Sequence, residues 1–122
     1  TRFHISIGGF GGPGYEVRLV NGRLPYRTEV ASLPEMFSPT AKEWEKFWAT
    51  VQRCDLWNWA PRYDDPDICD GTQWEVEIQI GTRAVTSFGS NSYPGGDRTV
   101  YSKVFRLFLR TIRQLIGGRS FG

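Results

Sequence analysis

The sequence predicts an α+β fold, in which an antiparallel sheet of about five strands is covered on one face by two helices. One N-terminal strand and two hairpins, each with alternating apolar and polar residues around a two-residue turn, supply the sheet. Two segments with apolar residues at every third or fourth position supply the helices. The predicted order is β-β-β-α-β-β-α. The length suits one core, so we expect a single domain over residues 1–122.

The N-terminal part of the chain is predicted to hold three strands. Residues 3–7 alternate apolar and polar side chains, which predicts the first strand. Segments 15–20 and 23–28 flank the pair Asn21-Gly22, which suits the two positive-φ positions of a type I′ hairpin turn. The glycine-rich stretch before this hairpin matches G-x-G-x-x-G. Because a strand rather than a helix follows it, we interpret it as a connector and not as a phosphate-binding loop.

The turn also sets the register of the first hairpin. Val17 should face Tyr26 on one side of the hairpin, and Glu16 should face Arg27 on the other as an exposed ion pair. Because Pro25 has no amide hydrogen to donate, we expect its strand to lie at an edge of the sheet.

Two overlapping signals predict the start of the first helix: Pro39 after Ser38, near the first helical position, and a capping box of Thr40 with Glu43. The helix is predicted to end near Arg53 or Cys54. Its apolar stripe has the spacing of one helical face and comprises Trp44, Phe47, Trp48 and Val51.

A second hairpin and a second helix complete the predicted fold. Segments 74–80 and 83–88 flank a Gly-Thr pair at 81–82, which is typical of a type II′ turn. A final helix is expected over about residues 101–116, with Gly117 as the residue that ends it. Its buried stripe comprises Phe105, Phe108, Leu109, Ile112, Leu115 and Ile116.

The composition excludes most catalytic chemistries. The chain has one histidine, His4, and two cysteines, without the CxxC or HExxH spacing of zinc sites. A nucleophilic triad would have to use His4, inside the predicted first strand. We therefore expect a non-enzymatic protein with no metal and no cofactor. No apolar run approaches the roughly 18 residues of a membrane-spanning helix, and no secretory leader is visible, so we expect no membrane association and a cytoplasmic location.

The charge is distributed unevenly along the chain. Before Arg98 there are nine basic and thirteen acidic residues, whereas from Arg98 onward there are six basic and no acidic residues. Four of these basic residues share one face of the final helix, namely Lys103, Arg106, Arg110 and Arg113. This stripe is either an anion-binding surface for nucleic acid or an acidic protein, or an ordinary solvated helix face. No nucleic-acid recognition motif accompanies it.

Four carboxylates fall within seven residues of an irregular segment: Asp64, Asp65, Asp67 and Asp70. Such oxygen ligands suit calcium, and clustered carboxylates suit acid/base catalysis, but the spacing is not that of an EF-hand. Asp also favours turns through local hydrogen bonds. Nearby, Cys54 and Cys69 are either a disulfide that closes a loop of about 15 residues or two free thiols.

Some aromatic residues in loops are not explained by the predicted helix and strand faces. They are Trp57, Trp59, Tyr63 and Tyr93. Loop aromatics either anchor a binding partner or plug the core beneath a loop. With Asp70 and Asn91, these four residues form the predicted interaction surface.

Four motifs occur in a recognisable order: W-x-x-F-W at 44–48, W-x-W at 57–59, D-G-T-x-W at 70–74 and G-S-N-x-Y-P at 89–94. This pattern resembles a group of small uncharacterised bacterial domains, over roughly residues 15–117. The resemblance implies a bacterial origin and a compact α+β domain, and it carries no activity.

Three functional hypotheses follow. The first is a protein-interaction module that binds an unknown protein partner. The second is a binder of nucleic acid or another polyanion through the final helix, and the third is a small enzyme that uses the carboxylates of residues 64–70. The sequence does not indicate an oligomeric state.

Overall fold

The computed structural model describes residues 1–9, 14–31, 33–64, 71–95 and 101–122. These residues form seven strands, two α-helices and one short 3-10 helix. In chain order the elements are β1 (Arg2–Gly9), β2 (Tyr15–Arg18), β3 (Leu24–Thr28), β4 (Glu35–Phe37), α1 (Ala41–Arg53), η1 (Leu56–Asn58), β5 (Arg62–Asp64), β6 (Thr72–Ile80), β7 (Arg83–Ser90) and α2 (Lys103–Leu115).

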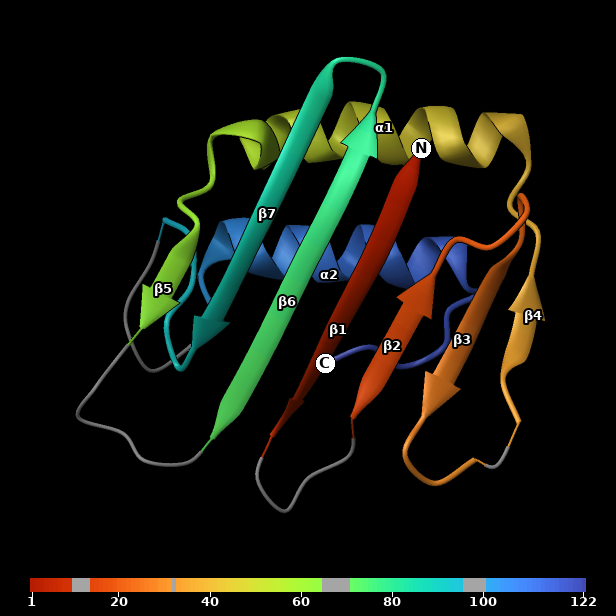
Figure 1. Ribbon diagram of the computed structural model, residues 1–122, viewed down its shortest axis with the longest axis horizontal. Coiled ribbons are helices and arrows are strands. Elements are labelled where there is room, and N and C mark those ends of the chain that lie inside the picture. The colour runs from red at the N-terminus through yellow and green to blue at the C-terminus, as the bar shows by residue number, and fades with distance from the viewer. Residues whose placement is uncertain (10–13, 32, 65–70, 96–100) are drawn as a thin grey trace.

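The seven strands form one mixed sheet with the order β4-β3-β2-β1-β6-β7-β5. Neighbouring strands are antiparallel except β5 and β7, which run parallel. Figure 1 looks onto one face of this sheet, and both helices cross behind the other face. The α+β class and the one-sided helix layer are therefore as predicted. The face toward the viewer carries no helix among the described residues.

The predicted sheet of five antiparallel strands is wrong at its two edges. The additional strands β4 and β5 have three residues each, which is too short for an alternating pattern to be recognised. The strand that contains Pro25 is not an edge strand either, because β4 pairs with it and places Met36 opposite Pro25. Proline removes only one amide donor, and each amide points toward a single neighbour, so a strand with one proline still pairs on both sides.

The two predicted hairpins form with the expected turns. Asn21 and Gly22 have positive φ angles of 51° and 76°, and Val17 lies opposite Tyr26. In the second hairpin Gly81 has a φ of 58°. Because a two-residue turn defines the pairing of both flanking strands, the register could be derived from the turn residues alone.

The predicted signals at the helix ends are also present. At the start of α1, Thr40 Oγ1 accepts a hydrogen bond of 3.1 Å from the Glu43 amide, and the Glu43 carboxylate accepts one of 3.0 Å from the Thr40 amide. The cap of α2 was not predicted: Ser102 Oγ accepts a hydrogen bond of 3.1 Å from the Phe105 amide. Gly117, with a φ of 63°, follows the last turn of α2. These contacts satisfy amides that would otherwise lack partners.

The core lies between the sheet and the two helices and is rich in aromatic rings. Phe3 of β1, Phe47 of α1 and Phe105 of α2 are almost completely buried there. After α2 the chain returns to this core, because Phe121 is fully buried. The Tyr26 hydroxyl donates a hydrogen bond of 2.7 Å to the carbonyl of Ser120, which ties this C-terminal segment to β3.

Candidate functional site

Three of the six residues of the predicted interaction surface are buried inside the protein. Trp59, Asn91 and Tyr93 are only 8%, 8% and 4% exposed. The rings of Trp59 and Tyr93 both pack against Phe105, with centroids at 6.2 and 4.9 Å. The indole of Trp59 also donates a hydrogen bond of 2.9 Å to the carbonyl of Cys54. The rings of Trp59 and Tyr93 therefore fill the core beneath their loops, which is one of the two alternatives that the sequence left open.

The other residues of that predicted surface are half-buried or outside the described part. Trp57 stacks on Trp48 with centroids 6.2 Å apart, and the guanidinium of Arg83 lies 5.8 Å from the centroid of the Trp57 ring. The Tyr63 hydroxyl accepts a hydrogen bond of 2.9 Å from the amide of Ala60. Asp70 lies outside the described residues.

The D-G-T-x-W and G-S-N-x-Y-P motifs meet in space and form a structural joint. The Thr72 amide donates to Asn91 Oδ1 at 2.9 Å, and the Asn91 amide donates to the Thr72 carbonyl at 2.9 Å. The Trp74 indole donates to the carbonyl of Ser92 at 2.9 Å. Since Ser102, the cap of α2, donates to the Pro94 carbonyl at 2.6 Å, the joint connects β6, the end of β7 and the start of α2. The motifs that carry the resemblance therefore have a structural role.

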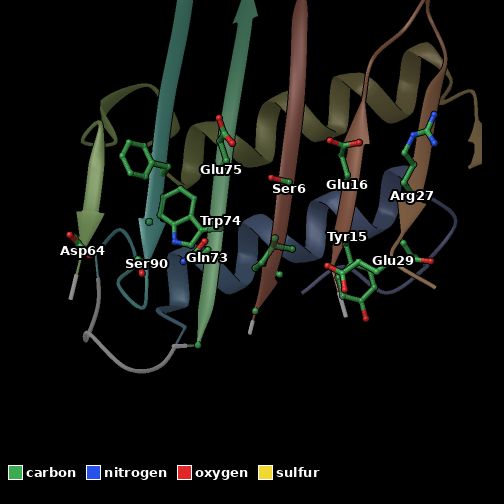
Figure 2. A pocket seen from close by; sticks show the side chains of 18 of the residues that line it. Ser6, Tyr15, Glu16, Arg27, Glu29, Asp64, Gln73, Trp74, Glu75 and Ser90 are labelled. Atoms are coloured by element: carbon green, nitrogen blue, oxygen red, sulfur yellow. The ribbon is translucent and has the colours of Figure 1, made fainter. Parts of the chain in front are cut away.

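The uncovered face of the sheet holds a groove of about 1060 Å³. Figure 2 shows this groove with labelled side chains from β5, β7, β6, β1, β2 and β3. Small residues, including Ser6, Gly8 and Gly14, are among the residues that line it. Its charged lining residues are Glu16, Arg27, Glu29, Arg62, Asp64 and Glu75.

The strand register places six of the lining residues in one row across the sheet. From β5 to β3 the row is Arg62, Phe88, Glu75, Ser6, Glu16 and Arg27. Adjacent strands are about 4.8 Å apart, so the positions of Glu75 and Glu16 are separated by about 10 Å, with Ser6 between them. Figure 2 shows Glu75, Ser6 and Glu16 side by side on the uncovered face. The row has guanidinium groups at its ends and carboxylates toward its centre.

The carboxylates of this row differ in their partners. Glu16 Oε2 lies 2.7 Å from His4 Nε2 and 4.0 Å from Arg18 Nη2. The predicted pair of Glu16 with Arg27 is therefore wrong, although the two residues are opposite each other as expected. The reason is that β1 lies on the other side of β2 and brings His4 close to Glu16. Within the described part of the chain, Glu75 makes no hydrogen bond or ion pair.

An exposed aromatic ring lies at one end of the row. Phe88 is 44% exposed, and the guanidinium of Arg62 lies 5.1 Å from the centroid of its ring. Arg62 also pairs with Asp64 at 3.3 Å. None of the residues in this row was identified as a site from the sequence. The available signal was that the strands carry polar residues on one side while two helices suffice to cover only the other.

The predicted carboxylate cluster falls largely outside the described structure. Of its four members only Asp64 is described, and residues 65–70 are not. Among the residues that are described, no group of three or more His, Cys, Asp or Glu side chains is arranged to hold a metal ion. Residues 10–13 of the glycine-rich connector are likewise outside the described part.

Cys54 is a buried free thiol, and burial raises its pKa to about 11. Its free form corresponds to the free-thiol alternative of the sequence analysis, and Cys69 lies outside the described residues.

The basic stripe of the final helix is present, with one member partly engaged. Lys103, Arg106 and Arg110 are exposed on α2. Arg113 is half-buried and donates a hydrogen bond of 3.2 Å to the carbonyl of Phe121. The exposed charged residues of α1 are Lys42, Glu43, Glu45, Lys46 and Arg53. The helix layer as a whole is therefore strongly basic.

No protein-family model and no curated protein matches this sequence. Within the described parts of the chain, neither helix is long and apolar enough to cross a membrane.

Proposed function

We propose that this protein is an interaction module that binds a protein partner on the uncovered face of its sheet. One observation carries the proposal: both helices cover the same face, and the opposite face is hollowed into a groove of about 1060 Å³. The loop surface expected from the sequence is replaced by this face, because two of its four aromatics, Trp59 and Tyr93, are buried and the other two are half-buried.

The chemistry of the groove supports this proposal. A solvated face is common in antiparallel sheets, so exposure alone is not specific. This face adds an exposed aromatic ring, Phe88, which contacts the guanidinium of Arg62. Aromatic and arginine side chains are the types enriched at the centres of protein interfaces. A groove that is lined by an aromatic ring and a guanidinium group suits the insertion of a segment of a partner protein.

The proposal is tested by filling the floor of the groove. Ser6→Trp places a large side chain between Glu75 and Glu16, and Thr86→Trp is the matched control because Thr86 lies on the same face outside the groove. We expect affinity purification to recover a specific partner with the wild type and Thr86→Trp but not with Ser6→Trp. Thermal unfolding should be the same for all three. Retention of the partner by folded Ser6→Trp would overturn the proposal.

The structure favours one second candidate, a polyanion-binding surface on the helix layer. Six exposed basic residues and only two acidic ones lie on α1 and α2. Lys103 is the first residue of α2, where the helix dipole disfavours a positive charge, so helix stability does not explain it. Binding at this surface would depend steeply on salt, because neutralised phosphates or sulfates release counterions.

Heparin chromatography tests the second candidate. The double variant Arg106→Glu, Arg110→Glu should elute at clearly lower salt than the wild type. The control Arg18→Glu, Arg23→Glu has the same change in net charge on exposed residues of the strand side. Equal losses for both variants would mean that retention follows net charge only, which would reject a dedicated helix surface.

A further inference from the structure

The uncovered face limits how a partner segment can bind. Central strands such as β1 and β6 use their backbone groups to pair with neighbours inside the sheet. A segment on the face of these strands cannot extend the sheet and must be held by side chains. Its own backbone groups stay in water, which is the natural state of a polyproline II helix, because that conformation has no internal hydrogen bonds.

The order of charges along the row determines the charge of the side chains that a bound segment carries at each position. Glu75 has no partner among the described residues, and Glu16 shares its charge with His4 and Arg18. The guanidinium groups of Arg62 and Arg27 are at the two ends of the row. Asp64, which pairs with Arg62 at 3.3 Å, and Glu29 also line the groove, so the arginines do not make its ends positive. The centre of the row is negative, so cationic side chains of a ligand are favoured there.

The spacing of the two glutamate positions determines where these cations lie. Glu75 and Glu16 are on strands separated by β1, so their backbone positions are about 9.4–9.8 Å apart. A polyproline II helix has three residues per turn and rises about 3.1 Å per residue, which places residues i and i+3 on one side about 9.3 Å apart. In a fully extended strand, side chains on one side are about 6.8 or 13.6 Å apart. Of these two extended conformations, polyproline II has the spacing that fits.

The exposed ring beside Glu75 adds an apolar requirement. Phe88 is one strand away from Glu75 in the same row and is 44% exposed. Proline rings pack against aromatic side chains in the known modes of polyproline recognition. A proline adjacent to the first cation would lie over Phe88.

We infer that the groove binds a proline-rich segment of a partner protein with basic residues at positions i and i+3, held by Glu75 and Glu16. This inference rests on the proposed function of the uncovered face, and it names the chemistry of the partner segment. In this inference Phe88 contacts the prolines. Ser6 is small enough to let the segment approach the sheet.

The test uses a labelled peptide of sequence Pro-Pro-Lys-Pro-Pro-Lys-Pro-Pro, with fluorescence anisotropy at low salt, where exposed charges are least screened. We expect it to bind about tenfold more tightly than a peptide of the same composition with adjacent lysines. That factor corresponds to about 1.4 kcal/mol. A peptide with glutamate in place of lysine should not bind.

Matched variants of the protein test the assigned carboxylate. Glu75→Gln should weaken binding of the Lys-Pro-Pro-Lys peptide about tenfold, which corresponds to about 1.4 kcal/mol. Glu77→Gln should leave it unchanged, because Glu77 is on the same strand and face but outside the groove and pairs with Arg2 at 2.7 Å. Equal binding of the two lysine orders, or no effect of Glu75→Gln, overturns the inference. If Ser6→Trp still loses the native partner in that case, the proposed binding face stands and only the assigned chemistry fails.

Discussion

The two faces of the sheet come from the same strands but have opposite properties. In β1, Ile5 is almost completely buried under the helices, whereas its neighbour Ser6 lies on the floor of the uncovered groove. In β6, Trp74 and Val76 are buried, and Glu75 between them is exposed. Because side chains alternate along a strand, one short sequence specifies both a core and a surface. The covered face therefore holds the packing that maintains the fold, and the uncovered face is the one on which we propose that a partner binds.

The largest expected effect concerns the covered face. Trp59→Ala removes a buried indole that contacts Trp74, Phe105 and Phe108, and should lower the free energy of unfolding by about 3–5 kcal/mol. Phe88→Ala on the uncovered face should lower it by less than about 1 kcal/mol, because the residue is already 44% exposed. Urea unfolding followed by circular dichroism measures both. Similar losses would contradict the division between the two faces.

A single methyl group gives the second test of the comparison. A Cβ at Gly89 would overlap the Trp74 indole nitrogen, so Gly89→Ala must displace a buried ring and its hydrogen bond to Ser92. We expect a loss of about 3 kcal/mol in urea unfolding. The matched control is Gly81→Ala in the β6–β7 turn, where nothing lies within 4 Å and only the positive φ of 58° is strained. It should cost about 1 kcal/mol. A larger loss for Gly81→Ala would show that turn strain, not core packing, limits this region.

The smallest expected effect lies at the edge of the sheet. Arg119 donates two hydrogen bonds, of 2.9 and 2.8 Å, to the Glu35 carboxylate, and these bonds lower the pKa of Glu35. A carboxyl whose pKa is lowered by folding stabilises the protein above its unfolded pKa and loses that contribution as the pH falls through its folded pKa. Glu35→Gln should therefore be slightly less stable than wild type near neutral pH. Both partners are about half exposed and are screened by solvent.

Urea midpoints measured between pH 7 and pH 2 check this prediction. The difference between wild type and Glu35→Gln should shrink as the pH falls below about 4, where free glutamate becomes protonated. A difference that grows toward acid pH would contradict the assigned direction of the pKa shift.

The parts of the fold that depend on neighbouring residues could be predicted from the sequence. The type I′ turn at Asn21 and Gly22 needs positive φ angles that few residue types adopt readily, so the two residue types alone predict it. The capping box of Thr40 and Glu43 joins groups three residues apart. The short edge strands β4 and β5 could not be predicted, because their hydrogen bonds come from β3 and β7 and not from their own composition.

The candidate site was predicted less well than the fold. The loop aromatics were predicted to form an interaction surface because no helix or strand face explained them. Trp59 and Tyr93 instead fill the core beside Phe105. The residues of the uncovered groove look like ordinary polar positions of strands. Glu75 and Glu16 become neighbours of Ser6 only through strand order, which the sequence did not specify.

The sequence by itself therefore determined the hairpins, their registers, the helix ends and the buried stripes, because each depends on contacts within a few residues or on a local period. The tertiary structure alone decided which strands are adjacent, which face the helices leave uncovered and which aromatics are buried. Those outcomes depend on contacts between residues far apart in the chain, such as Ser6 with Glu75 and Tyr26 with Ser120. Their energies are set by how the amphipathic elements pack together, and no local pattern encodes that packing.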